Sequence, residues 1–359
     1  MSRMTATSNP LAVIMAGGTG GHVFPALALA DELAQRGWRI HWLGGSRGIE
    51  TRAVPKAGYA MDILGTDSIR GRGLGGRVSG LIKVAIAGVK ALQLLRRLKP
   101  AVVVSLGGYT AGPGGVAAKL LGIPLVLHEQ NAVAGVTNRL LARIASGQAQ
   151  AFDGALAGAR VTGNPVRADI VALADPTTRA TGRHRPARVL VFGGSQGAQA
   201  LNEGVPAALA GVGLTLQIRH QAGRGKDQAT REAYAAAGID ASVSEFIDDM
   251  AEAYAWADLV IGRAGALTVS ELACAGVAAI LVPLPTAVDD HQTQNARWLA
   301  RAGAADVLPQ SELSTQLPVM LKHWLGDAEL MAQAAARGRA LAQPNATALL
   351  AELCEEHAR

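Results

Sequence analysis

The feature that most restricts the fold of this chain is the alternation of short apolar runs with Ala- and Leu-rich stretches of helical character. The apolar runs predict strands at Leu11–Ala16, Arg39–Leu43, Met61–Leu64, Ala101–Leu106 and Pro124–His128, and then at Arg188–Phe192, Leu214–His220, Val243–Phe246, Leu259–Gly262 and Ala279–Pro283. Helices are predicted between them, such as Phe24–Arg36, which Gly37 ends. Strands separated by helices are typical of parallel sheets covered on both faces, so the pattern predicts an α/β fold.

The two halves of the chain open alike, which predicts two tandem Rossmann-like domains. Leu11–Ala16 leads into Gly17-Gly18-Thr19-Gly20-Gly21, and Val189–Phe192 leads into Gly193-Gly194-Ser195-Gln196-Gly197. We place the first domain at residues 1–165, the second at 166–340 and a C-terminal helix at 341–359. That helix, over Ala340–Glu356, is expected to pack back on the first domain, although the sequence also allows the second. Ligands of such sheets bind at the carboxyl ends of the strands, so a cleft between the domains is the expected site.

Composition argues against several classes of protein. Of the 359 residues 49% are hydrophobic and 17% charged, which is too apolar for a disordered chain. Aromatic residues make up only 4%, which argues against a nucleic-acid stacking surface. Cys274 and Cys354 cannot form a disulfide framework, Met1–Pro10 lacks the apolar core of a signal peptide, and charged residues interrupt the apolar stretch Ser79–Leu95. A cytoplasmic protein without a transmembrane span is therefore expected.

The two glycine-rich turns are candidate anion sites. A strand that enters such a turn and then a helix exposes backbone N–H groups to an anion, and glycine allows close approach. Thr19 and Ser195 could add hydroxyl donors. Val23 stands where a dinucleotide fingerprint has its third glycine, so NAD binding is not favoured. Tight turns without any ligand remain the alternative.

Two polar segments follow later strands of the second half. In Gly262–Glu271, a predicted strand leads into a helix whose second turn carries Glu271, which could accept hydrogen bonds from neutral hydroxyls. An ordinary surface glutamate is the alternative. The segment Asp289–Asn295, which includes Gln292, follows the strand that ends at Pro283 and could bind sugar hydroxyls. Its alternative is a capped helix start.

These motifs together resemble one family. They are Gly17–Pro25, Gly107-Gly108-Tyr109, His128-Glu129-Gln130-Asn131, Gly163–Arg167, Gly193–Gly197 and Ala266–Glu271. In this order they resemble the MurG family of bacterial peptidoglycan synthesis, and the resemblance covers essentially the whole chain. It implies a two-domain glycosyltransferase of the GT-B type that moves N-acetylglucosamine from UDP-N-acetylglucosamine (UDP-GlcNAc) to lipid I and so forms lipid II.

The resemblance also implies site residues and a location. The positions that correspond to donor contacts are Thr19, Gly20, Gly21, Asn131, Arg167, Ser195, Ile247, Ala266, Leu267, Thr268, Val269, Ser270, Glu271 and Gln292. It implies that the second domain holds most of the donor and that the first faces the acceptor. Because the family's acceptor is a lipid, we expect a peripheral protein on the cytoplasmic face of the inner membrane, with other cell-wall synthesis proteins as possible partners.

The sequence contains no Asp-x-Asp motif, with which other transferases hold a divalent ion against the departing diphosphate. Helix starts and glycine-rich loops can stabilise that charge without a metal. Ser195 and the amides of Ala266–Thr268 are the candidates, with Arg167 as a charged partner. We therefore expect neither a metal nor a cofactor.

The acceptor hydroxyl must lose a proton as it attacks, and histidine is the usual base near neutral pH. His22 lies at the exit of the first glycine-rich turn and is the first candidate, although it could instead bond within its own loop. His128 and Glu129 end another strand of the first domain. Either could be the base, or Glu129 could orient His22.

A basic segment completes the candidate features. Between Ser68 and His128 there is no acidic residue, whereas the basic ones are Arg70, Arg72, Arg77, Lys83, Lys90, Arg96, Arg97, Lys99 and Lys119. The apolar helix predicted over Val78–Leu98 lies inside this run, with Leu81 and Ile82 beside Lys83. A basic amphipathic helix is typical of attachment to an anionic membrane, and Tyr109 is assigned to the same acceptor side. A core helix with an ordinary solvated face is the alternative.

The sequence therefore predicts an inverting, metal-independent N-acetylglucosaminyltransferase with UDP-GlcNAc and lipid I as substrates and no nucleic-acid partner. A UDP-GlcNAc epimerase of the same architecture is one rival, but it leaves the basic segment unexplained. A non-catalytic nucleotide-sugar-binding partner on the membrane is another, and it would need no base at His22 or His128.

Overall fold

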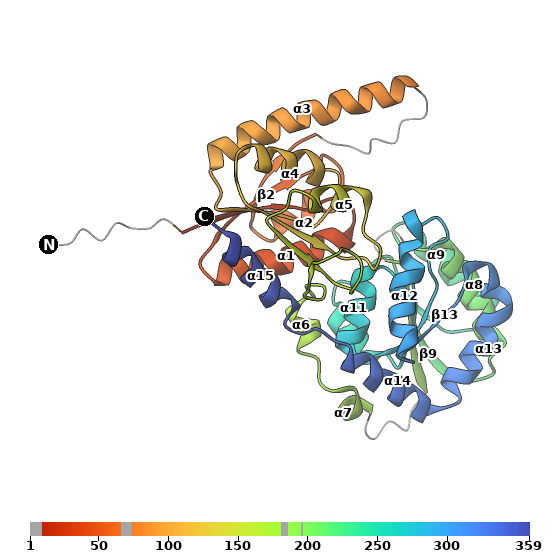
Figure 1. Cartoon of the computed structure of the whole chain (residues 1–359). Helices are drawn as coiled ribbons and strands as arrows, with labels where there is room; N and C mark the ends of the chain where they lie inside the picture. The colour runs from red at the N-terminus through yellow and green to blue at the C-terminus, as the bar shows by residue number, and fades with distance from the viewer. Residues whose placement is uncertain (1–8, 66–73, 181–185, 195–196) are drawn as a thin grey trace. The chain divides into compact units, whose positions relative to one another are not determined.

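The computed structural model describes residues 9–65, 74–180, 186–194 and 197–359 (Figure 1). They form two compact units. The first contains residues up to 130, then 134–165 and 345–359, and the second contains 131–133 and 166–344. Ser195, Arg70 and Arg72 lie outside the described residues, as do the side chains of Arg77 and Leu81.

The first unit is built on a seven-stranded parallel sheet with the order β3-β2-β1-β4-β5-β6-β7. Its strands are β1 (Leu11–Met15), β2 (Arg39–Gly44), β3 (Ala60–Ile63), β4 (Val102–Ser105), β5 (Leu125–Glu129), β6 (Gly147–Gln150) and β7 (Arg160–Val161). Its helices are α1 (Gly20–Gln35), α2 (Glu50–Lys56), α3 (Leu74–Leu98), α4 (Ala111–Leu120), α5 (Val136–Ala142) and α15 (Ala346–His357).

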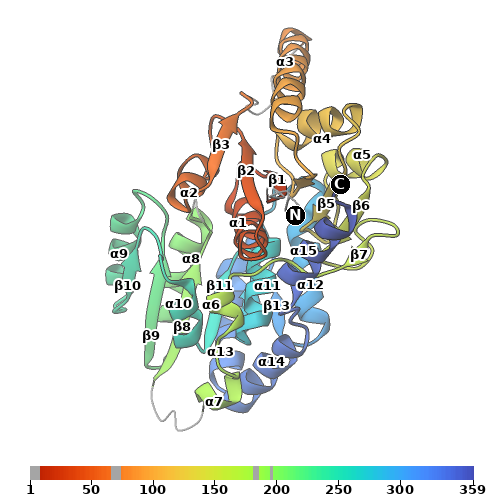
Figure 2. The ribbon, with the colours of Figure 1, turned by 90° about the vertical axis from the view of Figure 1, so that its left-hand side faces the viewer.

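Alternate residues of β1 enter two separate cores. Ala12 and Ile14 pack with α1 and α15, whereas Val13 and Met15 pack with α3, α4 and α5. Successive side chains of a strand point to opposite faces, so a sheet covered on both sides needs such continuous apolar strands. Figure 2 shows α1 and α15 near each other and α3 and α4 on the other side of the strands.

The second unit has a six-stranded parallel sheet with the order β10-β9-β8-β11-β12-β13. Its strands are β8 (Ala187–Phe192), β9 (Leu216–Gln221), β10 (Ser242–Ser244), β11 (Leu259–Gly262), β12 (Ala278–Leu281) and β13 (Ala305–Val307). Its α-helices are α6 (Ala168–Val171), α7 (Pro176–Ala180), α8 (Gln199–Ala210), α9 (Asp227–Ala236), α10 (Met250–Trp256), α11 (Ala266–Ala275), α12 (His291–Arg301), α13 (Leu313–Leu325) and α14 (Ala328–Ala340). Both sheets have Rossmann-like parallel order, which confirms the predicted fold class.

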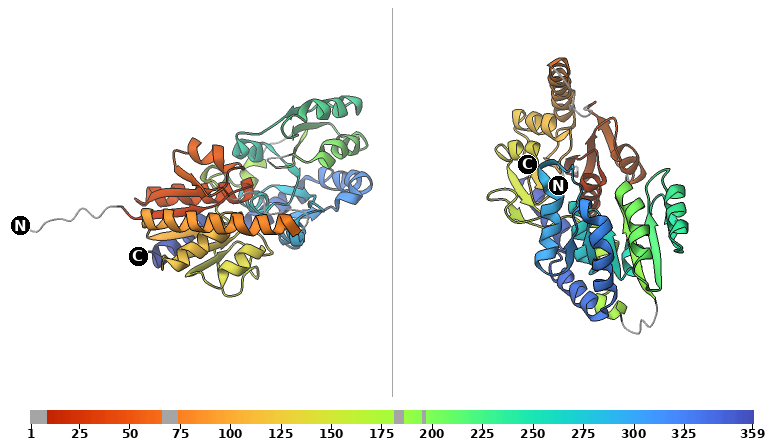
Figure 3. Two further views of the ribbon diagram at one scale, coloured as in Figure 1. Left: turned by 90° about the horizontal axis from the view of Figure 1, so that it is seen from above. Right: turned by 90° about the vertical axis from the view of Figure 1, so that its right-hand side faces the viewer.

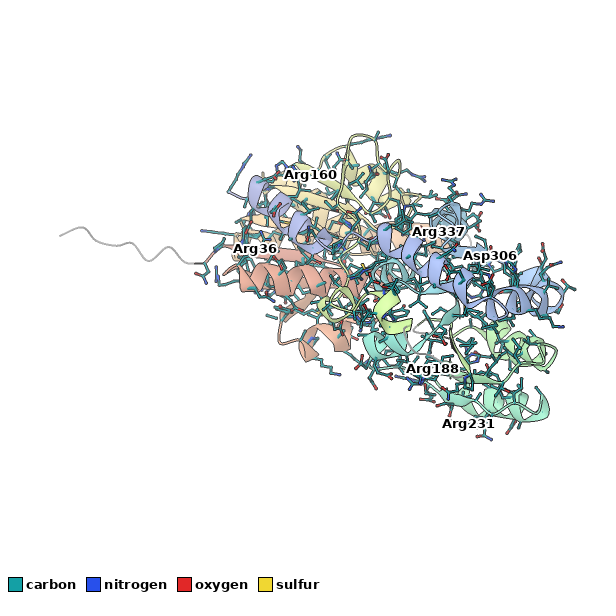
Figure 4. The ribbon with its side chains drawn as sticks, turned by 90° about the horizontal axis from the view of Figure 1, so that it is seen from below. Arg36, Arg160, Arg188, Arg231, Asp306 and Arg337 are labelled. Atoms are coloured by element: carbon teal, nitrogen blue, oxygen red, sulfur yellow. The ribbon has the colours of Figure 1, made fainter. Side chains whose placement is uncertain are left out.

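The end of the chain differs from the prediction of one helix over Ala340–Glu356. Helix α14 ends at Ala340 and α15 begins only at Ala346, because Pro344 cannot continue a helical hydrogen-bond ladder. Helix α15 belongs to the first unit, where Leu350 and Ala351 are fully buried. Ion pairs of Arg36 with Glu355 (2.9 Å) and of Arg160 with Glu356 (2.8 Å) flank it, and Figure 4 labels both arginines.

Helix α3 is the longest described helix, at 25 residues, and Figure 3 shows it lengthwise, packed on α4. Within the described parts of the chain, no helix combines the length and the apolar character needed to cross a membrane.

Candidate active site

The first glycine-rich turn connects β1 to α1 and places His22 in the first turn of that helix. The His22 Nδ1 atom lies 3.5 Å from the Thr19 hydroxyl, and the ring is half-buried. Gly107, with φ +99°, packs against the ring, because a Cβ there would lie 3.1 Å from its Cδ2 atom. The structure thus fixes the ring of His22 and leaves part of it open to solvent.

His128 is positioned very differently at the end of β5. It is fully buried, its Nε2 atom lies 2.9 Å from the Gly163 carbonyl oxygen, and Gln130 donates to Nδ1 at 3.1 Å. Burial lowers the pKa of His128 to about 4, so the ring is neutral near pH 7. With both nitrogens occupied and no access to solvent, His128 is less suited than His22 to act as a base.

Glu129 is also buried, and it anchors the start of α5. Its Oε2 atom accepts hydrogen bonds from Asn138 Nδ2 at 2.8 Å and from the Gly135 amide at 3.2 Å. A Cβ on Gly107 would lie 3.9 Å from Asn138 Nδ2 as well as against His22. The structure therefore brings His22 and the Asn138–Glu129 pair around the same glycine. Asn138 was missed by sequence reasoning, because no local pattern places it beside Gly107.

In the second unit, α11 begins at Ala266, four residues after β11 ends, as the pattern of Gly262–Glu271 predicts. Ala266, Leu267 and Val269 are buried, Thr268 and Ser270 are half-buried, and the Ser270 hydroxyl donates to the Ala266 carbonyl oxygen at 3.0 Å. The first-turn amides of this ten-residue helix lie at the carboxyl end of the sheet, where an anion could accept from them.

Glu271 is not a surface glutamate, since its side chain is nearly buried in the second turn of α11. Arg167 Nη2 lies 3.4 Å from Oε1, and the buried Tyr254 hydroxyl donates to Oε2 at 3.0 Å. Burial raises the pKa of Glu271, while the charge of Arg167 and the hydrogen bond from Tyr254 oppose that rise. Tyr254 was also missed by sequence reasoning, because nothing near it in the chain resembles a site.

The remaining candidates of the second unit lie on loops and on α12. The buried Asn295 accepts from the Ala132 amide at 2.8 Å and donates to Asn131 Oδ1 and to the Ala264 carbonyl oxygen, each at 3.2 Å. It therefore holds Asn131 near the segment that precedes α11. Gln292 accepts from the Leu284 amide at 2.9 Å.

Ile247 lies in the loop that connects β10 to α10 and is half-buried.

Asp289 and Asp290, directly before α12, both have left-handed backbones (φ +52° and +50°), which aspartate tolerates better than most residues. Across the described residues, no three His, Cys, Asp or Glu side chains are grouped so that they could hold a metal ion.

The basic segment also presents apolar side chains to solvent. On α3, Ile82, Ile86 and Val89 are each more than half exposed, and Lys83 and Lys90 are exposed beside them. Helix α4 packs on α3 and exposes Val116 and Leu120, and α5 packs on α4 and exposes Val136 and Leu140. We call these seven residues with Lys83 and Lys90 the α3–α5 face. Tyr109, just before α4, is exposed as well.

Comparisons with known proteins identify the family. The profile of the glycosyltransferase family 28 N-terminal domain matches residues 12–150, and that of its C-terminal domain matches residues 188–348. The chain is 51% identical to a protein of Aeromonas hydrophila over 96% of each chain, and 50% identical to one of Methylococcus capsulatus over 96% of this chain and 98% of the relative. Both relatives are named UDP-N-acetylglucosamine--N-acetylmuramyl-(pentapeptide) pyrophosphoryl-undecaprenol N-acetylglucosamine transferase.

Solved structures agree. The crystal structure of MurG from Acinetobacter baumannii matches with a TM-score of 0.84 and 41% identity, over 97% of this chain and 99% of that one. The calicheamicin glycosyltransferase CalG4, at 17% identity and a TM-score of 0.66, shares the fold. The chain therefore belongs to glycosyltransferase family 28 and, within it, to the MurG family.

Proposed function

We propose that this protein transfers N-acetylglucosamine from UDP-GlcNAc to the 4-hydroxyl of lipid I, with inversion at the anomeric carbon, to give lipid II. The observation that carries the proposal is sequence identity of 50–51%, across both domains, to transferases named for this reaction. The epimerase and the non-catalytic binding partner have no support among these relatives.

His22 acts as the general base in the proposed mechanism. Its ring nitrogen accepts the proton of the 4-hydroxyl while the oxygen forms a bond to the anomeric carbon and the bond from that carbon to UDP breaks. The ring of His22 is only half-buried against Gly107, which supports this assignment over His128, whose ring is fully buried. Glu129 supports the site through Asn138, which lies beside the same glycine.

UDP-GlcNAc is held mainly by residues of the second unit. Glu271 accepts hydrogen bonds from the ribose hydroxyls, and the first-turn amides of α11, with Ser195 and Arg167, stabilise the departing diphosphate. Gln292 contacts the sugar hydroxyls, and Asn131 and Ile247 are further donor contacts by their correspondence to the family pattern. Thr19, Gly20 and Gly21 complete the donor contacts from the first unit.

Turnover with UDP-GlcNAc and a water-soluble lipid I analogue tests the function. We expect a disaccharide product and UDP in the presence of excess chelator. Conversion of UDP-GlcNAc without acceptor would instead identify an epimerase, and donor binding without any product would identify a binding protein. Loss of turnover in chelator, restored by added magnesium, would contradict the metal-independent mechanism.

The α3–α5 face is proposed as the attachment surface for the cytoplasmic leaflet that carries lipid I. Its exposed aliphatic side chains would enter the interface, while Lys83 and Lys90 would meet anionic lipid, each worth about 1 kcal/mol near the surface. Lys119, exposed on α4, adds further positive charge.

Co-sedimentation with anionic vesicles at low and high salt tests this attachment. The double charge reversal Lys83→Glu with Lys90→Glu should weaken binding at low salt and leave donor affinity unchanged. The matched control, Lys56→Glu with Lys322→Glu, changes net charge equally at exposed positions on α2 and α13. Equal loss in both variants would show that only net charge matters, and no loss in either would place the attachment elsewhere.

A further inference from the structure

A buried carboxylate from outside the motif, that of Glu50, contacts the first glycine-rich turn. Glu50 is the first residue of α2, yet it is only 1% exposed. A carboxylate rarely becomes so buried unless hydrogen bonds replace its lost hydration. The burial of the Glu50 carboxylate therefore requires a structural or functional explanation.

Two backbone amides of glycine-rich loops donate hydrogen bonds to this carboxylate. The Gly18 amide donates to Oε2 at 2.9 Å, and the Gly45 amide donates to Oε1 at 3.2 Å. Gly18 follows β1 and Gly45 follows β2, so one side chain joins the carboxyl ends of two neighbouring strands. A hydrogen bond from an N–H group to a charged acceptor is stronger than one between two neutral groups.

Three glycines make room for Glu50. A Cβ on Gly17 would lie 2.7 Å from Oε1, one on Gly44 would lie 3.1 Å from Cγ, and one on Gly48 would collide with Oε2. Gly48 also has φ +152°, which side-chain-bearing residues rarely adopt. These glycines are therefore explained by an internal anion, without any bound ligand.

The turn that Glu50 holds is the one that carries His22. The Gly18 carbonyl oxygen accepts from the Ile49 amide at 3.4 Å, and the Thr19 carbonyl oxygen accepts from the His22 amide at 3.2 Å. On the other side, a Cβ on Gly108 would lie 2.7 Å from the Gly17 carbonyl oxygen. The backbone before His22 is thus clamped between Glu50 and the Gly107–Gly108 loop.

We propose that Glu50 is a positioning residue, whose carboxylate is the internal anion of the first glycine-rich turn and fixes the backbone from which His22 projects. The Gly18 amide is then committed to Glu50, so this turn serves the placement of the base more than the binding of a phosphate. The coupling to catalysis rests on the function proposed above, whereas the clamp itself does not.

Turnover of Glu50→Gln and Glu50→Ala tests the coupling to catalysis. A glutamine puts an NH₂ group opposite one of the two donor amides, so it cannot replace both hydrogen bonds. We expect kcat to fall on the order of 10- to 100-fold, as for a small misplacement of a catalytic group, and the KM for UDP-GlcNAc to change much less, because most donor contacts lie in the second unit. Acetate should partly restore kcat of Glu50→Ala by filling the vacated site, and chloride at equal ionic strength should not.

Val54→Ala is the matched control, because Val54 is a fully buried residue of the same helix whose apolar side chain cannot accept hydrogen bonds from the amides of the turn. If Val54→Ala loses as much kcat as Glu50→Gln for an equal loss of melting temperature, Glu50 is merely structural and the proposal is wrong. A kcat of Glu50→Gln within two-fold of the wild type overturns it too.

Amide hydrogen exchange tests the clamp without any reaction. In the wild type the Gly18 amide should be protected, and in Glu50→Gln or Glu50→Ala its exchange should accelerate far more than that of amides in β4. An unprotected Gly18 amide in the wild type would overturn the proposal even if neither variant folds. Protection of Gly18 in a wild type that fails to turn over UDP-GlcNAc with acceptor would instead fault the proposed function.

Discussion

Glu50 in the first domain and Glu271 in the second are both buried carboxylates near the carboxyl ends of their sheets, but the two are held in different ways. Glu50 in the first domain is 1% exposed and accepts from the backbone amides of Gly18 and Gly45. Glu271 in the second domain is 6% exposed and accepts from the side chains of Arg167 and Tyr254.

The difference between these partners separates a fixed anion from an exchangeable one. Backbone amides in a packed turn cannot swing away, so Glu50 stays where it is and organises the turn. Side chains can change rotamer, and the Arg167 side chain is 30% exposed, so Glu271 can exchange a partner for ligand hydroxyls. The two buried carboxylates thus suit different proposed tasks, with positioning of the base in the first domain and donor binding in the second.

His22→Ala should give the largest effect and would break the comparison if it did not. We expect kcat to fall ~10²–10⁴-fold, the usual contribution of a general base, with the donor KM changed by less than about two-fold. Steady-state kinetics with the soluble acceptor measure both. His323→Ala, at an exposed position on α13, is the control and should behave like the wild type.

His128→Gln and Glu129→Gln belong in the same series. A larger loss of kcat in either than in His22→Ala would move the base to β5. A weakened donor with unchanged kcat in His22→Ala would give the first turn the task that we assign to Glu271.

Much of the fold could be predicted from periodicity, because buried parallel strands are continuous apolar runs. Strand β11 has the predicted bounds, and β1 and β8 differ from theirs by one residue at one end. Strands β6, β7 and β13 were not predicted, since Gly147–Gln150 is half polar and the other two have only two and three residues. Their pairing comes from the sheet edge beside them and not from their own composition.

The candidate site could be predicted only where a motif is local in sequence. Position along the chain places His22 and Glu271 at helix starts that follow strands. Glu50 reaches Gly18, Asn138 lies beside Gly107, and Tyr254 donates to Glu271, and each of these pairs joins different elements of the fold. No local motif of a single sequence pairs them. The burial of His128 was not predicted either, because its partner Gly163 lies on another segment.

Each domain also buries a histidine, His128 in the first and His220 in the second, so the acid sensitivity of the two domains can be compared. Burial lowers the pKa of His128 to about 4 and that of His220 to about 3, below an ordinary value of about 6.5. Each histidine is therefore protonated at a higher pH in the unfolded chain than in the folded one. Its contribution to the free energy of unfolding is complete above about pH 6.5 and decreases as the pH falls toward about 4 for His128 and about 3 for His220. Each histidine should cost roughly 2–3 kcal/mol of unfolding free energy between pH 6.5 and pH 4.5.

Urea denaturation at several pH values, with probes for each domain, measures this loss. His220→Gln should flatten the pH dependence of the second domain alone, and His128→Gln that of the first. Curves parallel to the wild type in both variants would show that other groups govern acid sensitivity.

Glu271→Ala should weaken UDP-GlcNAc binding by ~1–3 kcal/mol, because the ligand's hydroxyls lose their acceptor. Calorimetric titration of the donor measures the change. The control is Glu329→Ala, at an exposed position on α14, which should bind the donor normally. Unchanged affinity in Glu271→Ala would leave the buried carboxylate a structural anion like Glu50, and the contrast between the domains would disappear.

Tyr254→Phe should give the smallest effect and tests how Glu271 is held. The ring keeps its edge-on contact with Phe192, at 6.0 Å between ring centroids, so the substitution removes only the hydroxyl that donates to Glu271. We expect donor affinity to fall by about 1 kcal/mol, the usual net worth of one hydrogen bond, with kcat nearly unchanged. Tyr234→Phe is the matched control, because it removes a buried hydroxyl of the same unit that bonds His220 at 2.9 Å. If both variants weaken the donor equally, the effect is general destabilisation, and if Tyr254→Phe binds like the wild type, Arg167 alone suffices to orient the carboxylate.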